Sequence, residues 1–167
     1  MREFSEELLT EPGRAKIREE MRKGELTAKE TVAVINAIEK FTLFQLLPEV
    51  EAALDHEDPW VRISALSALC FAFSADSKYS RIVEMFNSDD NEDVRSMAAT
   101  TLGNLACDGR YPQALRMLRS TLGSTAETFT VRDAAKSAYL HAIGRSIHDR
   151  MGMSIEDAMK IEDYGSP

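Results

Sequence analysis

Several features that would define a protein class are scarce in this sequence. Its 167 residues include 2 cysteines, 8 glycines and 5 prolines, too few for a disulfide scaffold, a collagen-like repeat or a proline-rich linker. No apolar run approaches the ~18 residues that cross a membrane as a helix. Hydrophobic residues make up 44% of the chain, close to the globular average of about 45–50%. We therefore expect one compact domain without membrane contact.

The chain also has fewer basic than acidic residues. The chain has 20 Lys and Arg against 28 Asp and Glu, for a formal net charge of −8. The excess lies near the N-terminus, because Met1 to Trp60 holds 8 basic and 14 acidic residues, whereas Tyr111 to Pro167 holds 7 of each. Phosphate backbones are attracted by clustered Lys and Arg, and no such cluster is present. Nucleic acid is therefore not an expected partner.

The two cysteines, Cys70 and Cys107, fall inside apolar helical patterns, where a free cysteine behaves as a small hydrophobe. Two cysteines without histidine support do not form a zinc site, so we expect buried thiols and neither a metal nor a cofactor. Residues 1–7 lack the apolar core of a signal peptide. A reducing, cytoplasmic location is the expectation.

The strongest positive signal is an internal repeat. The dipeptide Val-Arg recurs with spacings of 33 and 37 residues, and a good helix N-cap lies three positions before each Val. Apolar or small residues follow each Val at 4, 8 and 11 positions, and these offsets share one helical face. The three sets are Asp58, Val61, Ala65, Leu69 and Ala72; Asn91, Val94, Ala98, Leu102 and Leu105; and Thr128, Val131, Ala135, Tyr139 and Ala142.

A second apolar-periodic segment precedes each of these helices across a short polar turn. The three segments are Phe44 to Leu54, Ser80 to Phe86 and Gln113 to Leu122. The repeating unit is therefore a helical hairpin, and turns of different length account for most of the unequal spacing, since insertions in surface turns cost little. Such a hairpin buries its apolar faces only by stacking on its neighbours.

The pattern Asp58-Pro59-x-Val61-Arg62, echoed after Asn91 and Thr128, resembles HEAT repeats of the short bacterial and archaeal type. The resemblance implies an all-α fold, a right-handed α-α superhelix (a HEAT/ARM-type solenoid) of stacked antiparallel helix hairpins. We predict a single α-solenoid domain over residues 1–167. It would comprise a degenerate N-terminal capping repeat (1–43), three HEAT-like repeats (44–144) and a C-terminal cap and tail (145–167).

Both caps carry helix signals of their own. In the first cap, Pro12 marks a helix start, Gly24 a break and Thr27 an N-cap, and the second helix would turn Ile35, Ile38 and Phe41 inward. In the last cap, Ser154 followed three residues later by Asp157 predicts one short helix before a frayed tail.

The side of each repeat helix that faces away from the core is the expected functional surface. Offsets 2, 6 and 10 from each Val lie on that side, and the resemblance implies that these inner helices line a concave surface. Small polar side chains leave room for a partner there, and exposed aromatics often become interface anchors. The predicted partner-binding residues are Trp60, Ser67, Phe71, Ser96, Thr100, Asn104, Asp133, Ser137 and His141. The alternative, that Trp60 and Phe71 pack against an adjacent cap, stays open.

The recurrent arginines suggest a ladder for phosphate or carboxylate groups, but each of them begins a helix beside a polar turn. The resemblance implies that such arginines pair with turn carboxylates of neighbouring repeats and stiffen the stack. We therefore assign structural roles to the arginines and to the three N-caps: Arg62, Arg95, Arg132, Asp58, Asn91 and Thr128.

Signals for catalysis are weak. The sequence contains no P-loop, no Gly-x-Ser-x-Gly and no His-Glu-x-x-His motif. His141 lies two helical turns from Asp133, beyond the i to i+4 contact that would orient a base. The acidic run from Asp89 to Asp93 lacks the spacing of an EF-hand and is expected to be a solvated turn. We predict no catalytic residues, no metal site and no enzyme activity.

These observations favour a non-catalytic protein–protein interaction module, either a scaffold, an adaptor or an immunity-type inhibitor. Its acidity favours a basic protein partner. HEAT-like repeats also occur in bilin lyases, so the alternative is a bilin lyase-like or chromophore-handling protein that uses an apolar groove around Trp60, Phe71 and Cys70. A DNA-alkylation repair glycosylase of this shape would need a basic groove, which the predicted face lacks.

Overall fold

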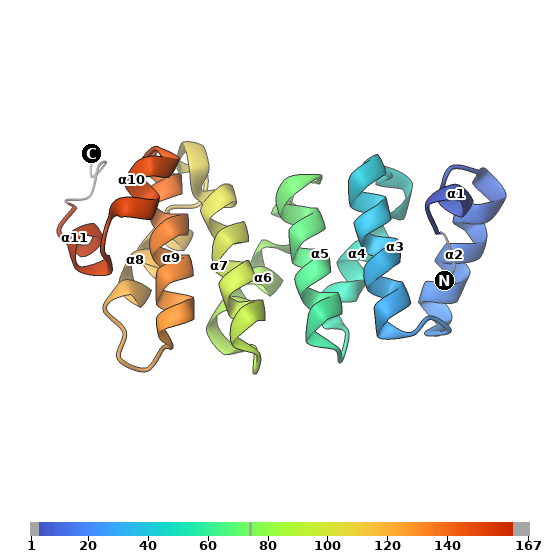
Figure 1. Ribbon diagram of the computed structural model, residues 1–167, viewed down its shortest axis with the longest axis horizontal. Helices are drawn as coiled ribbons and strands as arrows, with labels where there is room; N and C mark the ends of the chain where they lie inside the picture. The colour runs from blue at the N-terminus through green and yellow to red at the C-terminus, as the bar shows by residue number, and fades with distance from the viewer. Residues whose placement is uncertain (1–3, 74, 162–167) are drawn as a thin grey trace. The chain divides into compact units, whose positions relative to one another are not determined.

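The computed structural model describes residues 4–73 and 75–161, and the described residues form helices joined by turns, without a strand among them (Figure 1). The all-α prediction is therefore confirmed. The structure divides into two compact units, Met1–Ala75 and Asp76–Pro167. Each unit has its own set of fully buried side chains.

The described part of the first unit, residues 4–73 and 75, contains five α-helices and two short 3-10 helices. They are α1 (Phe4–Leu8), α2 (Glu11–Lys23), α3 (Ala28–Phe41), η1 (Phe44–Leu46), α4 (Leu47–Ala52), η2 (Ala53–Asp55) and α5 (Pro59–Phe71). Helices α3 and α5 lie side by side, and α4 and η2 pack against α5 (Figure 1). The two inner helices of this unit therefore present neighbouring faces.

Local signals set the helix ends near the N-terminus. Gly24 ends α2 with a φ of 66°, a left-handed conformation that suits glycine. Thr27 and Glu30 form a reciprocal capping box at the start of α3. The predicted break and N-cap are both confirmed. Ile35 and Ile38 of α3 are fully buried, as expected.

Two predictions for this unit need correction. Phe41 is only half-buried, because it is the last residue of α3. The expected outer helix over 44–54 is instead η1, α4 and η2 in succession. Pro48 explains the break, since it sits in the first turn of α4, where its missing N–H is harmless, and it could not continue a helix that began earlier.

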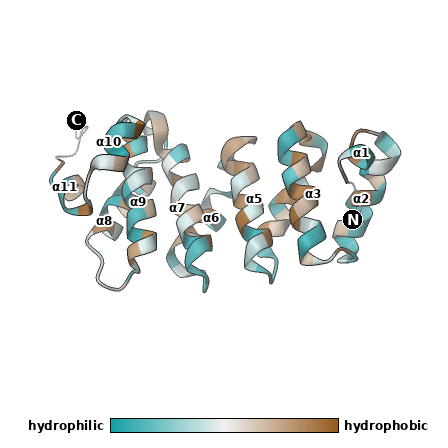
Figure 2. Ribbon diagram, viewed as in Figure 1, coloured by the Kyte–Doolittle hydropathy of each residue, from teal (hydrophilic) through white to brown (hydrophobic). Residues whose placement is uncertain are grey.

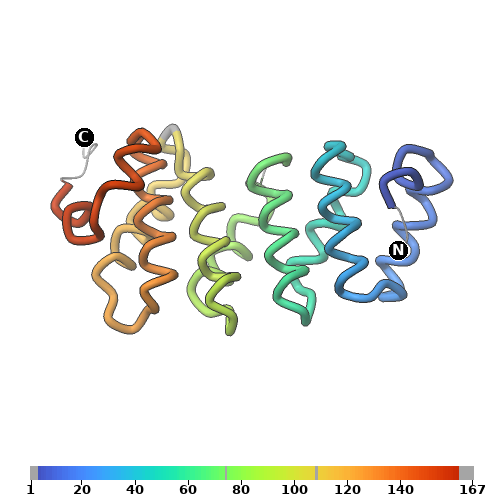
Figure 3. The backbone as a smooth tube through the Cα atoms, in the orientation of Figure 1, coloured from blue at the N-terminus to red at the C-terminus, as the bar shows by residue number. Residues whose placement is uncertain are grey.

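Over residues 76–161, which the structure describes, the second unit contains six α-helices and two 3-10 helices. They are η3 (Asp76–Lys78), α6 (Tyr79–Ser88), α7 (Glu92–Ala106), η4 (Cys107–Gly109), α8 (Pro112–Leu122), α9 (Phe129–Ala142), α10 (Ile147–Gly152) and α11 (Ile155–Met159). Figure 3 shows the chain reversing direction between α8 and α9, as expected for a helical hairpin. Helices α7 and α9 form the most extensive packing in this unit.

A polar and aromatic cluster closes one end of the second unit. The rings of Tyr79 and Tyr111 stack with centroids 4.4 Å apart, and the Tyr111 hydroxyl donates a hydrogen bond of 2.7 Å to Asp76. This hydrogen bond, which favours the protonated phenol, raises the pKa of Tyr111. The cluster ties η3 to the segment that precedes α8.

The C-terminal cap differs from the single short helix that we predicted. Ser154 caps α11 as expected, but a further helix, α10, precedes it and starts at a capping box formed by Ser146 and Asp149. Its short length and lack of buried residues explain why apolar periodicity did not reveal it. The predicted frayed tail, residues 162–167, lies outside the described residues.

Hydropathy differs sharply between helices of the first unit. In Figure 2, α2 is mostly teal, whereas α5 is mostly pale to brown. Only Arg62, Ser64 and Ser67 are polar along α5, so its exposed side must carry apolar groups. A helix that is apolar on every side is normally buried on every side. The exposed side of α5 is therefore a candidate for a surface that a binding partner covers.

Candidate interaction surface

The repeat register predicted from the sequence separates buried from accessible positions on the three inner helices. Residues at offsets 0, 4 and 8 from each repeat Val are at most 1% exposed. Residues at offsets 2, 6 and 10 are all at least partly exposed. The structure therefore places the predicted partner-binding residues on the accessible side of α5, α7 and α9.

In the first unit, a large aromatic residue lies at each end of this side of α5. Trp60 and Phe71 are each 64% exposed, although apolar residues of this size are usually buried. Ser67 lies between them, and its hydroxyl donates a hydrogen bond of 3.3 Å to Glu39 of the neighbouring helix α3. Nothing in unit one covers either aromatic side chain fully, so both remain available for contact.

A groove lies beside Trp60. It has a volume of about 450 Å³ and runs between the first halves of α3 and α5, where it is lined by Ala28, Lys29, Val32, Asp58, Trp60 and Ser64. The chromophore alternative predicted an apolar groove around Trp60, Phe71 and Cys70, whereas the observed groove joins Trp60 to α3 and leaves Phe71 and Cys70 outside its lining. We call this feature the Trp60 groove.

In the second unit, the predicted contact residues of α7 and α9 form a more polar surface. Ser96, Thr100 and Asn104 lie on α7, beside Asp133, Ser137 and His141 of α9, and all six are partly exposed. The Thr100 hydroxyl donates to the Ser96 carbonyl at 3.2 Å, so it is occupied within its own helix. That this surface continues the accessible side of α5 is a prediction.

Neighbouring side chains change the charge of Asp133 and the pKa of His141, and the sequence analysis predicted neither effect. Lys136 is buried, and its ammonium group forms a 2.7 Å ion pair with Asp133, which reduces the negative charge that Asp133 offers to a partner. Burial and the positive charge of Arg150 lower the pKa of His141. The i, i+3 spacing of Asp133 and Lys136 was the sequence signal that could have predicted their ion pair.

The residues assigned structural roles contact the turns that precede their helices. Asp58, Asn91 and Thr128 each cap their helix through a side-chain oxygen. Arg62 donates to the His56 and Glu57 carbonyls at 3.0 and 2.9 Å.

The other two repeat arginines also donate to carbonyl groups that precede their helices, and one of them forms an additional ion pair. Arg95 donates to the Asp89 carbonyl at 2.8 Å, and Arg132 donates to the Leu122 carbonyl at 2.9 Å. Arg95 also pairs with Glu127 at 3.3 Å, a turn carboxylate of the next repeat. Each arginine therefore closes its own hairpin, and Arg95 also bridges to a neighbouring hairpin.

The family model for HEAT repeats matches residues 47–139. The chain belongs to the HEAT-repeat family. HEAT repeats generally mediate protein–protein interaction and typically serve as non-catalytic scaffolds. No curated protein and no solved structure matches the chain.

Within residues 4–73 and 75–161, no group of three or more His, Cys, Asp or Glu side chains is placed to hold a metal ion. In the same part of the chain, no helix is both long and apolar enough to cross a bilayer.

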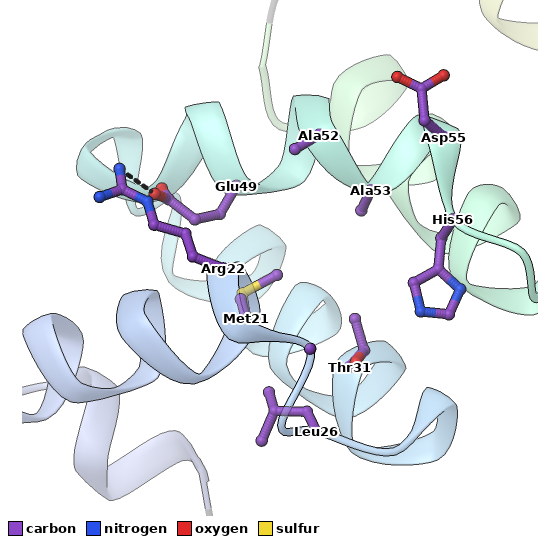
Figure 4. A pocket seen from close by; sticks show the side chains of 10 residues that line it. Met21, Arg22, Leu26, Thr31, Glu49, Ala52, Ala53, Asp55 and His56 are labelled. Atoms are coloured by element: carbon purple, nitrogen blue, oxygen red, sulfur yellow. Dashed lines mark ion pairs between the residues drawn. The ribbon is translucent and has the colours of Figure 1, made fainter.

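A second cavity occurs in the first unit, between the end of α2 and the α4–η2 segment. It has a volume of about 280 Å³. Figure 4 shows Arg22 and Glu49 at one end and His56 at the other. Glu49 is 5% exposed and pairs with Arg22 at 2.9 Å, so this carboxylate is held by a cation of the same unit. Met21, Leu26, Ala52 and Ala53 form the apolar part of the lining, and Gly24, Thr31 and Asp55 complete it.

Proposed function

We propose that this HEAT-repeat chain is a non-catalytic protein-binding module, a scaffold, adaptor or immunity-type inhibitor, that holds its partner on the accessible side of α5, α7 and α9. The proposal includes the stacking of all helix pairs into one right-handed superhelix over the single domain 1–167, with this side concave. Family membership supports the mode of action. The observation that carries the choice of surface is the exposure of Trp60, 64%, beside a groove.

An exposed tryptophan beside a groove is a typical interface anchor. Tryptophan is enriched among residues whose truncation costs at least ~2 kcal/mol of binding free energy, and such residues usually fill pockets that become fully desolvated. Phe71 provides a second exposed ring on the same helix. In the second unit, partly exposed polar side chains such as Ser137 of α9 would supply hydrogen bonds to the same partner.

The charge of the chain supports a basic partner. The formal net charge is −8, and a field of this sign accelerates encounter with cationic proteins and slows encounter with anionic ones. Association of this kind weakens as salt is raised, because the Debye length falls from about 10 Å at 0.1 M to about 3 Å at 1 M.

Chromophore handling is less well supported than protein binding. That alternative depends on an apolar groove formed jointly by Trp60, Phe71 and Cys70. The Trp60 groove is lined by residues of α3 and by Asp58, Trp60 and Ser64, and Phe71 and Cys70 lie outside this lining. Lys29 and Asp58 also make the groove partly charged. We therefore retain protein binding as the proposal.

Partner capture with matched variants tests this proposal. Tagged wild-type protein, Trp60→Ala, Phe71→Ala and Arg116→Glu would be used for affinity purification at low and high salt from cells that produce the protein. Arg116 is exposed on α8, an outer helix. We expect one protein to be recovered with wild type and Arg116→Glu and to be lost with the aromatic variants, provided circular dichroism shows that all are folded. Loss with Arg116→Glu alone would place the binding surface on the outer helices and refute the proposal.

A further inference from the structure

The Trp60 groove has features that select the chemistry of its occupant. The lining is largely apolar, with Trp60 on the α5 wall and Ala28 and Val32 on the α3 wall, and the groove is open enough to leave Trp60 64% exposed. A tryptophan face attracts cations through its quadrupole, and arginine is the cation most often found there, because its planar guanidinium also stacks on the ring. The groove therefore offers a flat surface suited to an arginine side chain.

The surroundings of the groove are negatively charged. The turn before α5 carries Asp55, Glu57 and Asp58 within four residues, and Asp58 itself lines the groove. Lys29, on the opposite wall, is the opposing charge in the lining. The first unit, residues 1–75, contains 14 acidic and 9 basic residues, so its net charge favours a cation despite Lys29.

This acidic turn is held in place before any partner arrives. The Asp58 carboxylate accepts a hydrogen bond of 2.8 Å from the Trp60 amide, and the Asp58 amide donates to the His56 ring at 3.0 Å. Arg62 binds two carbonyls of the same turn. Because the first of these contacts fixes the Asp58 carboxylate at the start of α5, little side-chain entropy would be lost there when a cation binds.

From this geometry we propose that the Trp60 groove receives an arginine side chain from a basic segment of the protein partner. The guanidinium stacks on the Trp60 indole and lies close to the carboxylates of Asp58 and Glu57. This inference rests on the proposed function and adds to it the chemical identity of the group that is recognised.

The only tryptophan of the chain, Trp60, makes the proposal directly measurable. The probe is a capped octapeptide of alternating glycine and arginine, titrated into the full-length protein while tryptophan fluorescence is recorded. A peptide with citrulline in place of arginine keeps the shape and removes the charge. We expect a saturable fluorescence change with the arginine peptide and an affinity at least about fivefold lower with the citrulline peptide.

Charge variants test whether the group that occupies the Trp60 groove is positively charged. Asp58→Asn keeps a good helix N-cap, and combined with Glu57→Gln it should weaken arginine-peptide binding about three- to tenfold. Lys29→Gln should strengthen binding, since it removes the opposing charge from the groove. The control is Asp90→Asn with Glu92→Gln, which removes two exposed carboxylates from the turn before α7 and should leave the affinity unchanged.

Several results would overturn the inference. Equal binding of the citrulline peptide would show that charge is not recognised, and weaker binding of the arginine peptide by Lys29→Gln would show that the peptide does not occupy the groove beside Lys29 as a cation. If no peptide binds although Trp60→Ala still abolishes partner capture, the arginine assignment is wrong and the proposed function stands. If Trp60→Ala leaves partner capture intact, the proposed function itself fails.

Discussion

Gly103 of α7 lies directly against Ala138 of α9. A Cβ atom at position 103 would lie 2.7 Å from the Ala138 Cβ and 2.8 Å from its carbonyl oxygen, closer than real Cβ contacts. The two inner helices of the second unit therefore meet backbone to backbone at this point. This close approach brings the accessible sides of α7 and α9 together and so builds the polar half of the proposed binding surface.

The Gly103–Ala138 contact predicts that Gly103→Ala destabilises the protein. Alanine has a helix propensity better than that of glycine by about 1 kcal/mol, but overpacking against backbone typically costs about 1–3 kcal/mol, so the clash should prevail. Urea denaturation followed by circular dichroism measures the difference. Gly152→Ala is the control, because nothing lies within 4 Å of a Cβ built there. A stability equal to or above wild type for Gly103→Ala would contradict this packing.

Leu102→Ala tests the core next to that contact. Leu102 is fully buried, so the substitution should lower the free energy of unfolding by about 2–5 kcal/mol through lost burial and the cavity left behind. The matched control is Leu9→Ala, since Leu9 is 62% exposed and should lose little. Equal losses at both positions would show that the repeat register of α7 is wrong.

The repeat core could be predicted from sequence because its signals are local and recur in register. Val61, Val94 and Val131 each follow an N-cap at the same spacing, and each is fully buried. Helix periodicity and capping chemistry act within a few residues, so a single sequence carries them. The same rules placed the accessible side of α5, α7 and α9 correctly.

What the sequence could not provide depends on contacts between segments that are distant along the chain. The Trp60 groove requires Val32 and Lys29 of α3 to lie beside α5, and no spacing rule predicts that pairing. The Arg95–Glu127 bridge spans 32 residues, and it was expected only from the resemblance to HEAT repeats, because local spacing gives no sign of it. Helix α10 was missed for another reason, since a helix that buries no residue has no apolar period to detect.

The Arg95–Glu127 pair predicts a structural role for Arg95. Arg95→Met removes both the hydrogen bond to the Asp89 carbonyl and the ion pair to Glu127. We expect a loss of about 1–3 kcal/mol, mainly because the buried turn carbonyl loses its partner. Glu127→Gln should cost less, about 0.5 kcal/mol, as is usual for partly exposed ion pairs. Both values come from denaturant unfolding.

Partner affinity separates this structural role from direct recognition. Folded Arg95→Met should capture the partner as well as wild type does, because the guanidinium is engaged within its own unit. If Arg95→Met remains as stable as wild type but loses the partner, then Arg95 belongs to the binding surface and its structural assignment is wrong.

His141 predicts a specific pH dependence of stability. Burial, and to a smaller extent the charge of Arg150, lowers the pKa of His141 in the folded protein, so the unfolded chain binds a proton at this site more readily. Unfolding is then favoured as pH falls below the unfolded value of about 6.5, and the full contribution to stability is present above it. His141→Gln should therefore lose less stability than wild type between pH 7.5 and pH 5.5.

Arg150→Gln isolates the electrostatic part of this effect. With the nearby positive charge removed, the pKa of His141 should rise toward its usual value, and the loss of stability on acidification should lie between those of wild type and His141→Gln. Chemical denaturation at the two pH values measures all three proteins, and the differences from wild type cancel the contributions of His56, His148 and the carboxylates. An acid sensitivity that is identical in wild type and His141→Gln would show that protonation of His141 is not coupled to folding.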